Sequence, residues 1–119
     1  MTLHVGMVTF DTHDARELAD WWAGHVGGRL QSFDDQFVMV LPTEPGRPAL
    51  GFQRVDDPTP GKNRVHVDLA SDDPGGAVER FVASGATRVA EHALPDGESW
   101  TVLADPHGNQ FCVSGAHAG

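Results

Sequence analysis

The chain has 119 residues, enough for one hydrophobic core that needs no disulfide or structural metal to hold it together. Seventeen acidic against eight basic residues give a formal net charge of -9, which repels phosphate groups and argues against nucleic acid and membrane surfaces as partners. Because one cysteine cannot form an internal disulfide and the start "MTLHVGMVTF" is neither basic nor continuously apolar, we expect a cytoplasmic protein.

The first half of the chain is predicted to begin with a strand over 3–10, followed by a helix. Asp14 and Glu17 form a capping box at the start of this helix, and Gly27 ends it. The buried face of the helix is an apolar stripe of Ala15, Leu18, Ala19, Trp22 and Val26. Three more strands are predicted over 28–33, 36–41 and 49–55.

The second half repeats this order of elements. After a strand over 64–70, Asp73 caps a helix with Pro74 at its first position, and Gly85 ends it. Its buried face is supplied by Val78, Phe81 and Val82, and further strands are predicted over 87–91, 99–104 and 110–114. The segment "DDPTPGKN" is typical of a connector between the halves, and "PDG" at 95–97 of a hairpin turn.

A shift of 59 residues places Asp14 on Asp73, Arg29 on Arg88 and Phe52 on Phe111. Such self-similarity at a fixed distance indicates an internal repeat. Together with the repeated order of elements, it predicts one α+β domain over 1–119 that consists of two βαβββ modules, about 1–56 and 63–116.

Alternation along the strands divides their side chains between two faces of a sheet. One face is apolar and is predicted to lie beneath the helices, with Val8, Phe10, Leu50, Phe52, Val65, Val67, Leu69, Phe111 and Val113. The other face is mixed, with Met7, Thr9, Asp11, Gln53, Arg64, His66, Asp68, Gln110, Cys112 and Ser114. This mixed face is either solvated or curved into a ligand cup.

Three segments carry a resemblance to a known family: "DTHDARELADWWAGHVGG", "RVHVDLASDD" and "DPHGN", the last placed between two predicted strands. They resemble the vicinal oxygen chelate superfamily of glyoxalases, bleomycin-resistance proteins and extradiol dioxygenases, in particular its small glyoxalase-like domains. The resemblance covers nearly the whole chain. It implies a curved mixed sheet with a concave ligand cup, and a homodimer, because relatives often form one.

Members of that superfamily that bind a metal take ligands from the first and last strand of each half, commonly His or Glu. The resemblance maps these positions to Met7, Gln53, His66 and Cys112, and the repeat agrees because it relates Met7 to His66 and Gln53 to Cys112. Hard divalent cations prefer carboxylate and imidazole, and catalytic zinc usually has about three protein ligands. Copper(I) would tolerate this set, but no other motif supports it. We therefore predict no metal and no cofactor.

Cys112 could be a metal ligand, a nucleophile or a packing residue. A reactive thiol needs a nearby cation or helix N-terminus, so we interpret Cys112 as packing that lines or backs the cup. His66 and Asp68 share a face about 7 Å apart, a spacing that suits ligand binding better than a general-base pair. Trp100 offers a stacking surface, as does Phe37. No constellation is expected around His4, His92 or His117.

These observations favour metal-independent binding of a small organic molecule, for example the sequestration of an antibiotic. The predicted ligand-binding residues are Met7, Gln53, His66, Asp68, Trp100 and Cys112. Two alternatives remain open. One is an enzyme, either a lyase, isomerase or hydrolase that uses His66 or a metal-dependent glyoxalase or dioxygenase, and the other is a dimerising module with a vestigial cup.

Overall fold

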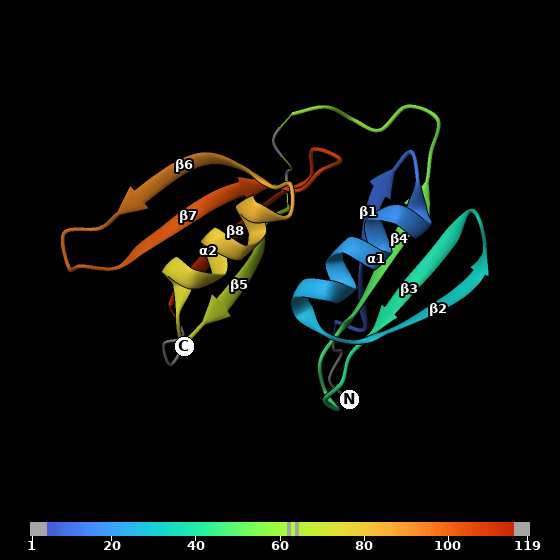
Figure 1. Cartoon of the computed structure of the whole chain (residues 1–119), viewed down its shortest axis with the longest axis horizontal. Helices are drawn as coiled ribbons and strands as arrows, with labels where there is room; N and C mark the ends of the chain where they lie inside the picture. Colours follow the sequence, from blue (N-terminus) through green and yellow to red (C-terminus); the bar gives the residue numbers. More distant parts are fainter. Residues whose placement is uncertain (1–4, 62, 64, 116–119) are drawn as a thin grey trace. The chain divides into compact units, whose positions relative to one another are not determined.

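The computed structural model describes residues 5–61, 63 and 65–115, and it divides the chain into two compact units with the boundary between Thr59 and Pro60 (Figure 1). We call the part before this boundary module 1 and the part after it module 2. The boundary lies inside the predicted connector "DDPTPGKN". That the two modules make a single domain stays a prediction.

Module 1 is a four-stranded mixed sheet covered on one face by a helix. The parallel pair β1–β4 and the antiparallel pairs β4–β3 and β3–β2 give the order β1-β4-β3-β2. Its elements are β1 (Met7–Thr12), α1 (Ala15–Val26), β2 (Arg29–Asp34), β3 (Phe37–Leu41) and β4 (Ala49–Arg54).

Module 2 repeats this topology with the order β5-β8-β7-β6, in which β5 is parallel to β8. Its elements are β5 (Val67–Ser71), α2 (Pro74–Ala83), β6 (Thr87–Ala93), β7 (Ser99–Ala104) and β8 (Gln110–Gly115). The predicted α+β class with two βαβββ modules is therefore confirmed, and each module forms its own sheet. The hairpin of β6 and β7 extends beyond the end of α2 (Figure 1).

Both helices begin and end where the sequence predicts. Asp14 Oδ1 accepts a hydrogen bond from the Glu17 amide at 3.1 Å, and Asp73 Oδ1 accepts one from the Gly76 amide, also at 3.1 Å. These caps satisfy amide groups that have no partner within the helix. Beyond α2, Gly85 adopts a φ of 115°, a left-handed conformation that glycine reaches without steric cost, so the chain turns away there.

The core of each module lies between its helix and one face of its sheet. In module 1 the Phe10 ring contacts Trp22 and Phe52 at centroid distances of 5.2 and 5.1 Å. In module 2 Phe81 contacts Phe111 at 4.8 Å. Buried aromatic side chains of this size contribute much of the hydrophobic stabilisation of a small core. The buried face predicted from alternation is thus observed for Phe10, Phe52 and Phe111.

Two predicted strands begin later than expected. β1 begins at Met7, and the predicted residues Leu3 and His4 lie outside the described residues. β5 begins at Val67, opposite Phe111, so Val65 precedes the strand and is 75 % exposed. The placement of Val65 among the buried residues was therefore wrong, because pairing with β8 starts only two residues later. No helix in the described part of the chain is long and apolar enough to cross a membrane.

The pairing of the parallel strands differs between the modules. Phe10 lies opposite Phe52 in module 1, whereas in module 2 Leu69 lies opposite Val113. The repeat relates Phe10 to Leu69 and Phe52 to Phe111, so the same pairing in module 2 would place Leu69 opposite Phe111. The observed partner of Leu69 is Val113, two residues further along β8. Because side chains alternate, a displacement by an even number keeps every residue on its predicted face.

Candidate functional site

A pocket of about 530 Å³ lies on the face of the module 2 sheet that is opposite α2. Its walls come from the approach to β5, from β5, β7 and β8, and from the turn before β7. The lining residues are His66, Asp68, Leu69, Ala70, Glu98, Ser99, Trp100, Cys112, Ser114 and Gly115. We call this the open-face pocket.

The floor of the open-face pocket consists of small side chains. Cys112 and Ser114 project from β8, the strand between β5 and β7, and Ala70 projects from β5 beside Ser114. Asp68 pairs with Cys112, and Trp100 pairs with Ser114, so the larger side chains stand on either side of this floor. The pocket exists because small residues occupy the middle of the face and large ones its edges.

The segment "DPHGN" positions β8 and therefore the floor. Asp105 is buried, and its Oδ1 accepts hydrogen bonds from the amides of His107 at 2.9 Å and Asn109 at 3.0 Å. The Asp105 amide donates to the Asn109 carbonyl at 2.8 Å, and Gly108 has a φ of 92°. This turn sets the pairing of β7 with β8. The segment that carries the resemblance is thus structural, and it places Cys112 and Ser114.

Trp100 stacks on an imidazole that the sequence did not single out. The rings of Trp100 and His92 lie with centroids 5.3 Å apart and planes at 25°, and the two residues are a cross-strand pair of β6 and β7. The expectation that His92 has no constellation around it was therefore wrong. The "PDG" turn could have indicated this pair. Leu94 and Glu98 pair across the turn, and two residues further along each strand His92 lies opposite Trp100.

Cys112 lies in the floor with 8 % of its surface exposed. Its pairing partners on either side are Asp68 of β5 and Val102 of β7. A thiol in this place is a small apolar side chain at the bottom of a pocket.

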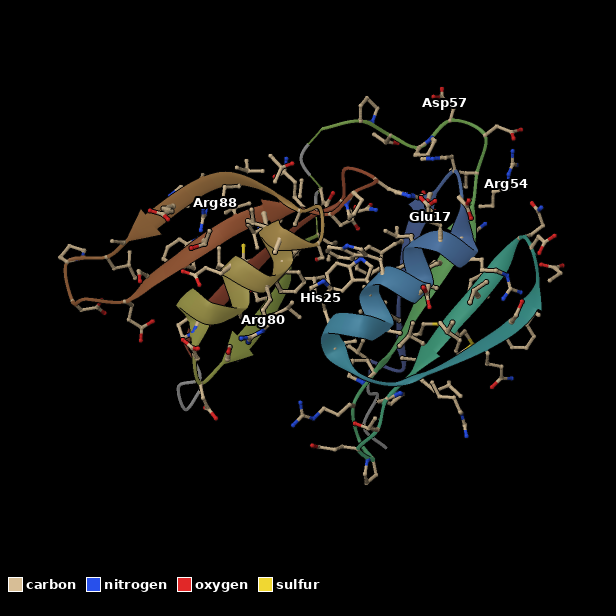
Figure 2. All side chains as sticks on the ribbon, in the orientation of Figure 1. Glu17, His25, Arg54, Asp57, Arg80 and Arg88 are labelled. Atoms are coloured by element: carbon tan, nitrogen blue, oxygen red, sulfur yellow. The ribbon has the colours of Figure 1, made fainter. Side chains whose placement is uncertain are left out.

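The described lining of the open-face pocket carries negative charge. Asp68 and Glu98 both line it, and none of its described lining residues is a lysine or arginine. Arg80 and Arg88, the cationic residues of module 2 that the structure describes, belong to α2 and to the helix side of β6 (Figure 2). Carboxylates in a concave site attract cations.

The open face of module 1 is occupied by larger side chains. A Cβ atom added to Gly51 would lie 2.9 Å from Phe37 Cζ, 3.0 Å from Met7 Sδ and 3.0 Å from Thr9 Oγ1. These three side chains therefore converge over Gly51 and cover the middle of the sheet. Gln53 is exposed on the same face and pairs with Asp11 of β1 and with Phe37 of β3.

The six predicted ligand-binding residues fall into two groups. Module 2 brings His66, Asp68, Trp100 and Cys112 to the open-face pocket. Met7 and Gln53 lie on the open face of module 1. Met7 pairs with Ala49 at the start of β4, whereas Gln53 lies near the end of β4, so Met7 and Gln53 are about 13 Å apart along the strand direction. That all six residues serve one cavity stays a prediction.

The donor atoms of the open-face pocket do not suit a divalent metal. Within either module, the described His, Cys, Asp and Glu side chains form no group of three or more that could hold a metal ion. The pocket offers one imidazole and two carboxylates from different strands or turns, whereas catalytic metals need about three converging ligands. Metal independence stays a prediction.

Comparisons with known proteins place this fold. The model of a family described as "Glyoxalase-like domain" matches residues 7–114. None of the curated proteins compared with the sequence matches it.

Solved structures resemble the chain over nearly its whole length. A member of the glyoxalase/bleomycin resistance protein/dioxygenase superfamily from Sphaerobacter thermophilus has 22 % identity and a TM-score of 0.73, with 98 % of this chain and 99 % of that chain covered. A glyoxalase-related enzyme from Fulvimarina pelagi has 17 % identity and a TM-score of 0.71, with coverage of 97 % and 89 %. The bleomycin-binding protein of Streptomyces verticillus, solved with copper(II)-bleomycin, has 17 % identity and a TM-score of 0.64, with coverage of 98 % and 100 %.

Proposed function

We propose that this chain, which belongs to the glyoxalase-like domain family, binds a small organic molecule without a metal ion, in the open-face pocket of module 2. The resemblance identified in the sequence is confirmed by the family match over residues 7–114. The observation that carries the proposal is the pocket itself. Its volume of about 530 Å³ lies within the range of small-molecule sites, roughly 300–1,000 Å³.

The lining of the pocket supports binding. Trp100, held against His92, supplies an apolar plane, while His66 and Asp68 supply polar groups at the other side. A small number of polar groups around an aromatic surface is typical of sites that recognise organic ligands. Cys112 adds little hydrogen-bonding capacity, because a thiol is a weak donor and a weak acceptor.

Binding is favoured over catalysis by the position of His66 relative to Asp68. His66 precedes β5, so strand pairing fixes the position of Asp68 but not that of the imidazole, whereas a general base needs a partner that orients its ring. An enzyme that uses His66 is the second candidate, because His66 lines the pocket and one structural relative is described as a glyoxalase-related enzyme.

The fold is used for ligand binding elsewhere, since a bleomycin-binding protein of Streptomyces verticillus shares it. A shared fold does not by itself assign a ligand. We extend the proposal to the sequestration of an antibiotic or similar compound by a cytoplasmic homodimer, with Met7 and Gln53 of module 1 contributing to the same cup.

A binding screen with a variant that fills the floor tests the proposal. Ser114→Leu places a larger side chain beside Trp100, whereas Thr101→Leu adds the same side chain to the opposite face of the neighbouring strand. We expect organic compounds that raise the melting temperature of the full chain to lose at least about tenfold in affinity with Ser114→Leu and to keep it with Thr101→Leu. Compounds that bind both variants equally well would place the site elsewhere.

Metal analysis tests the second part. Protein purified without a histidine tag should contain no stoichiometric zinc, iron, nickel or manganese, since the described residues of the pocket form no converging donor set. Close to one equivalent of a transition metal after mild chelation would contradict metal-independent binding and favour the enzyme.

A further inference from the structure

We infer that the ligand of the open-face pocket is a planar organic cation, held between the Asp68 carboxylate and the face of the Trp100 indole. The inference rests on the proposed function and names the ligand class of the same site. Three features of module 2 carry it: the charge of the pocket, the aromatic stack of Trp100 on His92, and the distance between Asp68 and Trp100.

The charge of the pocket selects against anions. Asp68 and Glu98 are both part of the lining, and the arginines that the structure describes in module 2 lie on the helix side of the sheet. An anionic ligand would lie beside the Asp68 carboxylate, and none of the described lining residues is a lysine or arginine. A cationic ligand instead gains from the Asp68 carboxylate, and the net charge of -9 on the chain adds long-range attraction.

The aromatic stack selects for a flat ligand with positive charge. The indole of tryptophan attracts cations through its quadrupole more strongly than other aromatic side chains do. His92 lies against Trp100 with a centroid distance of 5.3 Å, so the stack restricts the orientations that the indole can adopt. A preordered side chain loses less conformational entropy when the ligand binds, which increases the affinity.

The distance between the two groups sets the size of the ligand. Asp68 and Trp100 lie on β5 and β7 with β8 between them, and their pairing partners Cys112 and Ser114 are two residues apart. Strand spacing and rise per residue then place their Cα atoms about 12 Å apart. The floor between them consists of the small residues Ala70, Cys112 and Ser114. A fused aromatic ring system with a charged edge fits this space.

The test compares three probes with the same ring system. Proflavine is a flat cation at neutral pH, acridine is its neutral counterpart, and acridine carboxylate is an anion. Each is titrated into the full chain and followed by fluorescence and calorimetry. We expect proflavine to bind at least about tenfold more tightly than acridine, and acridine carboxylate to bind most weakly.

Matched variants separate the contribution of Asp68 from general charge. Asp68→Asn should weaken proflavine about three- to tenfold and change acridine by less than about twofold, while Asp72→Asn, which removes the same charge outside the pocket, should change neither by more than about twofold. His92→Ala should weaken both ring systems, and His92→Phe, which keeps an aromatic partner for Trp100, should restore them.

The outcomes distinguish the two proposals. Equal affinity for proflavine and acridine, or equal effects of Asp68→Asn and Asp72→Asn, would overturn the cation and leave the pocket in place. Failure of all three probes, while other compounds bind in a manner sensitive to Ser114→Leu, would also overturn this ligand class alone. If no compound shows binding sensitive to Ser114→Leu, the proposed function fails and the inference fails with it.

Discussion

The two modules share a topology but differ in what stands on their open faces. In module 1, Met7, Thr9 and Phe37 converge over Gly51 and cover the middle of the sheet. In module 2 the corresponding middle of the sheet is occupied by Cys112 and Ser114, and a pocket remains above them. A repeated topology therefore does not produce two equal sites. The sizes of a few side chains decide which face is hollow.

Displaced strand pairing increases this difference. In module 1, Gln53 pairs with Asp11 on one side and with Phe37 on the other. In module 2, Ser114 pairs with Trp100 on one side and with Ala70 on the other. The repeat in the sequence instead relates Gln53 to Cys112. Module 2 therefore has a serine and an alanine beside its aromatic residue, where module 1 has a glutamine and an aspartate.

The largest expected effect concerns the cores, where the modules are alike. Phe52 and Phe111 are both fully buried and are related by the repeat. Replacing either by alanine should lower the free energy of unfolding by about 3–5 kcal/mol, because a buried ring is lost and a cavity remains. Urea denaturation followed by circular dichroism measures this.

Phe33→Ala is the control for the core variants, because Phe33 is 61 % exposed and should cost less than about 1 kcal/mol. A core variant as mild as this control would show that its module contributes little to the stability of the chain.

Truncation of aromatic residues should show which of the two open faces binds the ligand. Trp100→Ala or His66→Ala should weaken a ligand found in the screen by about 1–3 kcal/mol, since each removes a contact in the open-face pocket. Isothermal titration calorimetry gives the affinity. Phe37→Ala changes an aromatic residue of the module 1 face, and a loss as large as that of Trp100→Ala would show that module 1 shares the ligand.

Gly51 provides a test of the crowded face. Gly51→Ala should lower the free energy of unfolding by about 1 kcal/mol, because the added Cβ would lie within 3.0 Å of Phe37 Cζ and Met7 Sδ. Met7→Ala should remove part of this penalty in the double variant, which a double-mutant cycle in urea measures. Independent, additive effects of the two substitutions would mean that Met7 does not occupy the space above Gly51.

The smallest effect is expected for Cys112. Cys112→Ala should change ligand affinity by less than about 0.5 kcal/mol, because the thiol forms few hydrogen bonds, and should lower stability by about 1 kcal/mol through a small void. Calorimetry and urea denaturation provide the two values. If the variant keeps its fold and its affinity but loses a measured turnover, Cys112 is a nucleophile, and an enzymatic function replaces the proposed binding function.

Local chemistry made several elements predictable from the sequence. Asp14 and Asp73 cap their helices through their own side chains, and glycines beyond each helix adopt conformations that other residues avoid. Strand faces were equally predictable within the observed strands, since alternation assigns each residue without reference to a partner, whereas Val65 precedes β5 and was misplaced. The family followed from "DPHGN" and the repeat because both are visible in the order of residues.

Pairing between strands could not be read in the same way. His92 came to lie on Trp100 only through the antiparallel pairing of β6 with β7. The two-residue displacement of β8 against β5 leaves no mark in the sequence, because it preserves every face.

The sequence by itself determined the class of the fold, the positions of the helices and the face on which each candidate residue lies, because these depend on neighbours along the chain. Only the tertiary structure decided that His66, Asp68, Trp100 and Cys112 line one pocket and that Met7, Thr9 and Phe37 fill the matching face. A cavity is the space left between side chains of different strands. Its size therefore depends on pairing and packing, which join residues that are distant in sequence.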